Sequence, residues 1–268
     1  MENKKVTKPV VEAKQTPTPP KHRFPTETVD LPSRGKLYDK GSPLVSGQIE
    51  MKYMTAKEED IITNNNYINN GTVIDKLLEA LIVTPGVSLD DLVLGDKNAL
   101  LMSARVLGYG QEYTFEYYGE DTTVDLSILK HKEIDWKLIT EGVNEFSWTL
   151  PHTDTPITFQ LITGHVEKKI DAELKGLTKI NKRASAEMST RLKHMLLSVN
   201  GDSDRNAIRD FVDNFFLARD ARSFREYIKK ISPDVEMIFD WEGYDGAIEE
   251  REIPIKPNFF FPDVGTSL

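Results

Sequence analysis

Residues 95–117 read GDKNALLMSARVLGYGQEYTFEY, and within them the apolar pattern changes from that of a helix to that of a strand. Asp96 predicts a helix N-cap, because its carboxylate can accept hydrogen bonds from the free amides of a first turn. Apolar residues then recur at helical spacing over Leu100–Leu107, and Gly108 predicts the end of the helix. Aromatic and polar residues alternate over Tyr113–Tyr117, which predicts a half-buried strand.

The region before this stretch, residues 29–111, predicts strands and helices. Leu31–Leu44 is rich in glycine, proline and serine, as turns are. Apolar and polar residues alternate over residues 49–53, which predicts a strand. A capping box at Thr55 starts one helix, and an apolar stripe over residues 72–83 predicts another.

The region after it, residues 112–163, predicts a β-rich unit. Apolar and polar residues alternate over Phe146–Trp148 and again over Ile157–Leu161. A turn between two prolines separates the two stretches, so they are predicted to form a hairpin. The whole unit is expected to be small and antiparallel.

Residues 164–268 predict a helical region with a terminal hairpin. An apolar stripe over Met188–Val199 predicts one helix, and two more helices follow it. Apolar and polar residues then alternate over residues 235–255, which predicts a second hairpin. Because helical and strand patterns are segregated rather than alternating, the predicted class is α+β: a helical N-terminal segment, a small antiparallel β unit, and a helical C-terminal segment ending in a hairpin.

Composition narrows the class of protein. The chain has 268 residues, 39% of them hydrophobic and 29% charged, as expected for a globular protein with a sizeable core. A net charge of −9 argues against bulk nucleic-acid binding. There is no cysteine, which removes disulfides and thiolate chemistry. No apolar run approaches the ~18 residues of a membrane helix, and no secretory signal is expected.

The first segment, residues 1–28, is expected to be a flexible arm rich in basic residues, proline and threonine. Its first 25 residues carry six basic side chains against Glu2 and Glu12. Two interpretations stay open: a solvated extension, or an arm that becomes ordered on a partner.

No catalytic motif is present. The chain lacks a phosphate-binding loop, a nucleophile elbow and a His-Glu-x-x-His pair. No two of the five histidines lie three or four residues apart, as helical zinc ligands would. Gly108–Gly110 follows a helix rather than a strand, so it reads as a turn and not as a dinucleotide site. The sequence therefore predicts a protein that is not an enzyme and uses no cofactor or metal.

The C-terminal aromatic run is unusual. Phe259–Phe261 lies between Pro257 and Pro262, and such a run is poorly suited to water. It is expected either to fold back into the core or to pack on a partner.

Several stretches together resemble a known phage family. In chain order they are Leu31–Tyr38, Gly41–Leu44, Met54–Ile61, Gly71–Asp75 and Gly95–Tyr113. Their order and spacing are similar to those of the T4-type baseplate proteins of contractile-tailed phages, best over residues 29–163.

The resemblance implies a structural or assembly protein of the baseplate hub. Such a protein would be made in the host cytoplasm and found in the virion baseplate or in a tail-assembly intermediate. Its partners would be other tail or baseplate proteins, with a homo-oligomer left open and no membrane or nucleic acid expected. The candidate contact residues are Leu31, Pro32, Arg34, Gly35, Tyr38, Tyr109, Phe259, Phe260 and Phe261. For the loop and the Gly-Tyr-Gly turn, a scaffold role that positions the first helices is the alternative.

The resemblance also implies a zinc-ribbon-like unit at residues 112–163, for which relatives use cysteine pairs. Here the equivalent stretch, Phe115–Asp121, has none. We therefore expect a degenerate, metal-free unit held by apolar and aromatic packing. Elemental mass spectrometry of the purified protein should find far less than one zinc per chain, and a full equivalent would contradict this expectation.

Three other functions stay open. The protein could be an assembly chaperone that is absent from the mature virion. It could bind nucleic acid through the arm and the basic stretch Lys179–Arg191, although a solvated helix face explains that stretch as well. It could be a hydrolase that brings a dispersed histidine to a carboxylate with a perturbed pKa.

Overall fold

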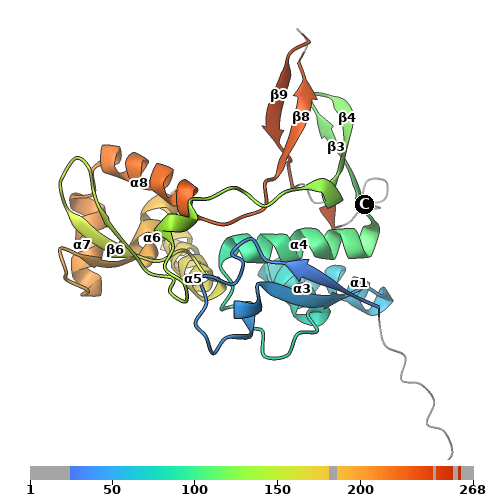
Figure 1. Cartoon of the computed structure of the whole chain (residues 1–268), viewed down its shortest axis with the longest axis horizontal. Coiled ribbons are helices and arrows are strands. Elements are labelled where there is room, and N and C mark those ends of the chain that lie inside the picture. The colour runs from blue at the N-terminus through green and yellow to red at the C-terminus, as the bar shows by residue number, and fades with distance from the viewer. Residues whose placement is uncertain (1–24, 181–185, 244–245, 256–258, 261–268) are drawn as a thin grey trace, which may run out of the picture.

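Blocks of helices are separated by antiparallel hairpins, as Figure 1 shows. The computed structural model describes residues 25–180, 186–243, 246–255 and 259–260. The α+β class is confirmed, and so is the hairpin near the C-terminal end. Residues 1–24 of the expected arm lie outside the described residues, and the first strand already begins at Thr26.

The elements of the N-terminal half are β1 (Thr26–Asp30), η1 (Pro43–Ser46), β2 (Gln48–Lys52), α1 (Ala56–Ile62), α2 (Asn65–Asn70), α3 (Val73–Leu81), α4 (Leu94–Tyr109), β3 (Glu112–Tyr117), β4 (Glu120–Asp125), η2 (Leu126–Ile128) and η3 (Trp136–Leu138). Those of the C-terminal half are β5 (Phe146–Thr149), β6 (Pro156–Phe159), α5 (Gly164–Ile180), α6 (Glu187–Met195), β7 (Leu196–Val199), α7 (Arg205–Asn214), α8 (Ala218–Ile231), β8 (Ile238–Glu242) and β9 (Ile248–Glu252).

The β1–β2 hairpin and helices α1, α3 and α4 form the first block. The capping box at the start of α1 is confirmed, because Glu58 accepts a hydrogen bond from the Thr55 amide at 3.0 Å. α3 buries Leu77, Leu78 and Leu81 on one face, as its spacing predicts. The hydrophobic pattern therefore sets which faces of these helices meet.

The start of α4 differs from the sequence prediction. The helix begins at Leu94 with Val93 as its N-cap, so the expectation that Asp96 caps it is wrong. Asp96 lies within the first turn and directs its carboxylate toward the Leu31–Leu44 loop instead. Next to it, Gly95 packs so closely on Pro233 that a Cβ atom would lie 1.8 Å from the Pro233 carbonyl oxygen. Only glycine permits this contact between α4 and the C-terminal part of the chain.

A three-stranded sheet, ordered β5-β6-β7, belongs to the second block with α5 to α8. The hairpin predicted for its first two strands is confirmed. The apolar stripe assigned to one helix over Met188–Val199 is divided, because α6 ends at Met195 and the next residues pair with β6 as β7. On this sheet, Trp148 stacks on Tyr227 of α8 with 4.9 Å between ring centroids.

Two hairpins distant in sequence lie side by side and project above α4 in Figure 1. They are β3–β4 and β8–β9, each a separate two-stranded antiparallel sheet. Aromatic rings join them: Phe115 and Phe239 are 5.3 Å apart, and Tyr117 and Trp241 are 5.7 Å apart. We call these four strands the hairpin pair. Its buried side chains join a hydrophobic core that runs from Val29 to Phe260.

Candidate functional site

Half of the Leu31–Leu44 loop is buried. Leu31, Pro32, Gly35 and Tyr38 are all buried, and of the candidate contact residues in this loop only Arg34 is exposed. The Arg34 guanidinium lies 4.6 Å from the centre of the Trp136 ring, where the cation is attracted to the aromatic face. This placement favours the scaffold role for the loop over a direct contact role.

Asp96 anchors this loop to α4. Its carboxylate accepts hydrogen bonds from the Ser33 amide at 2.8 Å, the Ser33 hydroxyl at 2.6 Å and the Tyr38 hydroxyl at 2.5 Å. The Tyr38 hydroxyl in turn accepts from the Val93 amide at 3.1 Å. Burial raises the pKa of Asp96 while these hydrogen bonds oppose the rise, and burial and the nearby Asp96 raise the pKa of Tyr38. Because each donor in this network has an acceptor, the network holds the loop in place and has a structural rather than a catalytic role.

The Gly-Tyr-Gly turn is held by a buried arginine. Arg105 donates to the carbonyl oxygens of Gly110 at 2.8 Å and Glu112 at 2.9 Å. Its guanidinium also lies 5.4 Å from the ring of Tyr109, which is half-buried. Gly110 has φ +84°, so glycine is required where α4 turns into β3.

The aromatic C-terminus reaches the same region. Phe259 and Phe260 are buried, and Phe259 packs edge-on against Tyr113 at 4.9 Å. Phe259 and Phe260 therefore fold back into the core, which is one of the two alternatives expected for this run. Phe261 lies outside the described residues.

The hairpin pair carries two strongly exposed apolar side chains. Tyr118, in the β3–β4 turn, is 66% exposed and stacks on Trp241 at 5.1 Å. Ile248, at the start of β9, is 72% exposed. Large apolar side chains this exposed gain free energy when a partner covers them.

Charge on the hairpin pair is almost uniformly acidic. Apart from Arg251, every charged side chain in its four strands is a carboxylate: Glu112, Glu116, Glu120, Asp121, Asp125, Asp240, Glu242, Glu249, Glu250 and Glu252. Between β4 and β8 lies an open groove of about 490 Å³, lined in part by Asp125, Asp240 and Glu250. We call Tyr118, Ile248 and these carboxylates together the hairpin face.

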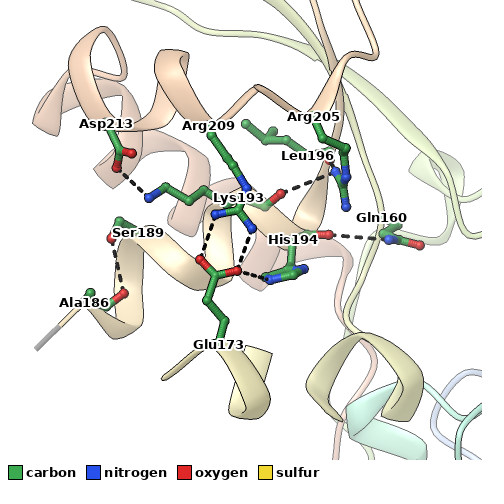
Figure 2. Close-up of polar contacts among 10 residues, drawn as sticks. All are labelled: Gln160, Glu173, Ala186, Ser189, Lys193, His194, Leu196, Arg205, Arg209 and Asp213. Carbon is green, nitrogen blue, oxygen red and sulfur yellow. Dashed lines mark hydrogen bonds and ion pairs between the residues drawn. The ribbon is translucent and has the colours of Figure 1, made fainter. Parts of the chain in front are cut away.

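One histidine does meet a carboxylate, as Figure 2 shows. His194 Nε2 of α6 lies 2.9 Å from Glu173 Oε2 of α5, and Arg209 of α7 donates two hydrogen bonds to the same carboxylate, at 2.9 and 2.7 Å. The hydrogen bond from Arg209 is the largest cause that lowers the pKa of Glu173. A carboxylate held ionised in this way is a poor proton donor or acceptor at neutral pH. The cluster therefore links three helices, α5, α6 and α7.

We expect Glu173→Gln to lower the free energy of unfolding by about 1 kcal/mol at pH 7, because the paired charge on Arg209 loses its partner. The folded-state pKa of Glu173 lies below its unfolded value, so its contribution is present above about pH 4.3 and is lost as pH falls through the folded pKa. Urea unfolding at pH 7 and at pH 3 measures this. Glu226→Gln, in an exposed pair with Arg222, is the matched control. Equal losses for both variants at both pH values would contradict the assignment.

Other residues considered at the sequence level do not converge. In the basic stretch, Lys179 is exposed and Arg191 pairs with Glu187 at 3.1 Å, while residues 181–185 lie outside the described residues. Among the described residues, no group of three or more His, Cys, Asp or Glu side chains could hold a metal ion. Nor does any helix there combine the length and hydropathy needed to cross a membrane.

Sequence reasoning did not find the hairpin face. It predicted a strand over Tyr113–Tyr117 and a hairpin over residues 235–255 in separate regions, and it placed contacts in the Leu31–Leu44 loop, at Tyr109 and at Phe259–Phe261. The signal available was the shared aromatic alternation of Tyr113–Tyr117 and Phe239–Trp241, which suits two strands that pack face to face. Compared with protein-family models, with curated proteins and with solved structures, the chain matches none of them.

Proposed function

We propose that this protein is a structural or assembly component of the baseplate hub of a contractile phage tail, and that it binds a partner through the hairpin face. The hub assignment is supported by the order of motifs from Leu31 to Tyr113, which resembles the T4-type baseplate proteins. The binding assignment is supported by one observation: the hairpin pair projects from the body and carries exposed apolar side chains together with an excess of carboxylates.

The chemistry of this face selects the partner. Tyr118 and Ile248 supply apolar anchors of the kind that dominate interface energetics. The surrounding carboxylates favour a partner with basic side chains and disfavour an acidic one. We therefore expect a basic, partly apolar surface on a tail protein, and binding that weakens as salt concentration rises.

The test is capture of tail-assembly intermediates from infected cells on the purified, tagged chain. The double variant Tyr118→Ser/Ile248→Ser should reduce capture of the tail protein by roughly tenfold or more, because two exposed apolar contact residues are lost. Both side chains are exposed, so the melting temperature should stay close to that of the parent.

Phe215→Ser is the matched control, since Phe215 is a 58% exposed aromatic residue at the end of α7, away from the hairpin pair. It should leave capture unchanged. Equal capture by parent and double variant would contradict the role of the hairpin face. Capture of no tail protein at all by the parent chain would contradict the hub assignment itself.

A further inference from the structure

The segment just before β8 is paired with the segment that follows β4. The Glu236 amide donates a hydrogen bond to the Lys130 carbonyl at 2.8 Å. The Lys132 amide donates to the Asp234 carbonyl, also at 2.8 Å. These two bonds form a short antiparallel ladder, which ends at Glu236 where the chain continues into β8.

The same edge continues along β8 without a backbone partner. The Ile253 amide donates to the Met237 carbonyl at 2.9 Å, so Met237 faces β9. Backbone groups alternate between the two sides of an antiparallel strand, so Ile238 and Asp240 face away from β9, on the side that Glu236 presents to Lys130. In the part of the chain that the structure describes, β8 pairs only with β9. The amides and carbonyls of this outer edge are therefore available to an added strand.

The groove between β4 and β8 runs beside this edge. It has a volume of about 490 Å³, and Glu236 and the consecutive residues 238–240 all line it. Val124, Ile128 and Leu129 contribute apolar surface to it. Ile128 is 71% exposed, so a ligand in the groove would remove this side chain from water.

The charge of the groove selects the ligand. Asp125, Glu236, Asp240 and Glu250 line it, against the single cation of Lys130. Such a site favours basic side chains. An extended segment points successive side chains in opposite directions. A segment in which aliphatic and basic residues alternate therefore places one set on the apolar lining and the other near the carboxylates.

A second copy of this chain suits the groove less well. Its outer strands carry carboxylates of their own, such as Glu27 in β1, Asp121 in β4 and Glu249 in β9. Like charges placed opposite each other destabilise strand pairing. The net charge of −9 on each copy opposes the same contact. The charge therefore favours a basic partner chain.

We propose that an extended segment of a basic tail protein, with alternating aliphatic and basic residues, adds to the outer edge of β8 and lies in the groove beside β4. It continues the ladder that begins at Lys130, and its backbone pairs with Ile238 and Asp240. Main-chain pairing of this kind supplies affinity, while the groove selects the side chains. The identity of the partner rests on the proposed function, to which this inference adds the mode of binding.

A fluorescent peptide of sequence KVKVKVK is the probe, and its anisotropy with the purified full chain measures binding. The peptide EVEVEVE should bind roughly tenfold or more weakly than KVKVKVK, because its charges repel the groove. Two further versions of KVKVKVK are N-methylated, one at every valine and one at every lysine. One version should lose roughly tenfold or more in affinity and the other little, because only one set of amides faces β8. Equal affinity of both versions and the parent peptide would overturn main-chain pairing.

A proline on the edge of β8 tests the same pairing from the side of the protein. Asp240→Pro removes an amide that faces away from β9, so the β8–β9 bonds remain. It should weaken binding of KVKVKVK roughly tenfold or more. Asp240→Asn keeps the amide and removes only the charge, so its loss should stay below about fivefold. Equal affinities of these two variants would overturn the proposal.

Thr28→Pro is the control for an edge proline. Thr28 is an exposed residue of β1 whose amide faces away from β2, because the Leu31 amide, three positions on, bonds the Gly47 carbonyl. This variant should bind KVKVKVK as the parent chain does. Melting temperatures establish that each variant is folded.

Hydrogen exchange keeps the proposal testable if Asp240→Pro does not fold. In the parent chain, the amides of Ile238 and Asp240 should exchange roughly tenfold or more slowly once KVKVKVK is bound. The amide of Phe239, which faces β9, is the internal control and should change little. Slow exchange at Ile238 and Asp240 before the peptide is added would overturn the proposal, because another part of the chain or a second copy would already occupy the edge.

Capture of tail-assembly intermediates separates this inference from the function on which it rests. If Tyr118→Ser/Ile248→Ser lowers capture while Asp240→Pro captures as well as Asp240→Asn, the hairpin face stands and the strand addition is wrong. If the parent chain captures no tail protein, the hub assignment fails, and the peptide measurements alone decide the strand addition.

Discussion

Asp96→Ala is expected to lower the free energy of unfolding by about 3–5 kcal/mol. The substitution removes the acceptor for three buried donors on Ser33 and Tyr38, and each buried donor left unpaired costs about 1–3 kcal/mol. Domains of this kind have a total stability of only about 5–15 kcal/mol, so the variant should unfold at markedly lower urea concentration.

Asp91→Ala is the matched control, because Asp91 is an exposed carboxylate three residues before α4 and should change stability by less than about 0.5 kcal/mol. Tyr38→Phe should give an intermediate loss, since it removes one donor and keeps the ring packed. A loss below about 1 kcal/mol for Asp96→Ala would show that the Leu31–Leu44 loop does not depend on this anchor.

Phe259→Ala is expected to cost about 3–5 kcal/mol, the usual range for a large aromatic residue removed from a core. Phe259 is fully buried and contacts the rings of Tyr113 and Phe260, each with 4.9 Å between centroids. Tyr113 also donates to the Pro254 carbonyl at 2.9 Å, so the cavity would open where the chain end meets the hairpin pair.

Urea unfolding of the full chain measures this loss, with Phe215→Ala as the control. Phe215 is 58% exposed, and its truncation should change stability by less than about 0.5 kcal/mol. If the two phenylalanine variants lost the same small amount, the C-terminal run would not belong to the core. A binding role for it would then return as the better explanation.

The parts of the fold that the sequence predicts well are those governed by local periodicity. The stripe of α3 and the alternation of β5 and β6 each bury the face that their spacing indicates. The division at Met195 could not be seen in this way, because apolar residues at Leu192, Met195, Leu196 and Val199 keep helical spacing. Pairing with β6, a partner about 40 residues away, makes the last four residues a strand.

The role of Asp96 was missed for the same physical reason. Its position before an apolar run is typical of an N-cap, and nothing local distinguishes a cap from an anchor. Its partners Ser33 and Tyr38 are 63 and 58 residues away in sequence. The hairpin face also depends on distant contacts. Alternation predicts the strand β3 and the β8–β9 hairpin, but it does not predict the packing of β3–β4 against β8–β9.

For the contact residues first expected in the loop, burial favours a scaffold role, with exposed Arg34 as the exception, and the hairpin pair carries the more exposed apolar side chains. Both outcomes follow from burial. Leu31 is 1% exposed and Tyr38 8% exposed, whereas Tyr118 and Ile248 are more than half exposed. A binding surface requires side chains that a partner can cover.

Quantitative mass spectrometry of purified virions and of tail-assembly intermediates from infected cells tests the central claim most directly. We predict that this chain is present in tail intermediates at a fixed ratio to baseplate proteins, and that the Tyr118→Ser/Ile248→Ser variant is depleted from them. Its presence in virions as well would make it a structural subunit, and its restriction to intermediates would make it an assembly factor. A chain that never sediments with tails or tail intermediates would contradict the account.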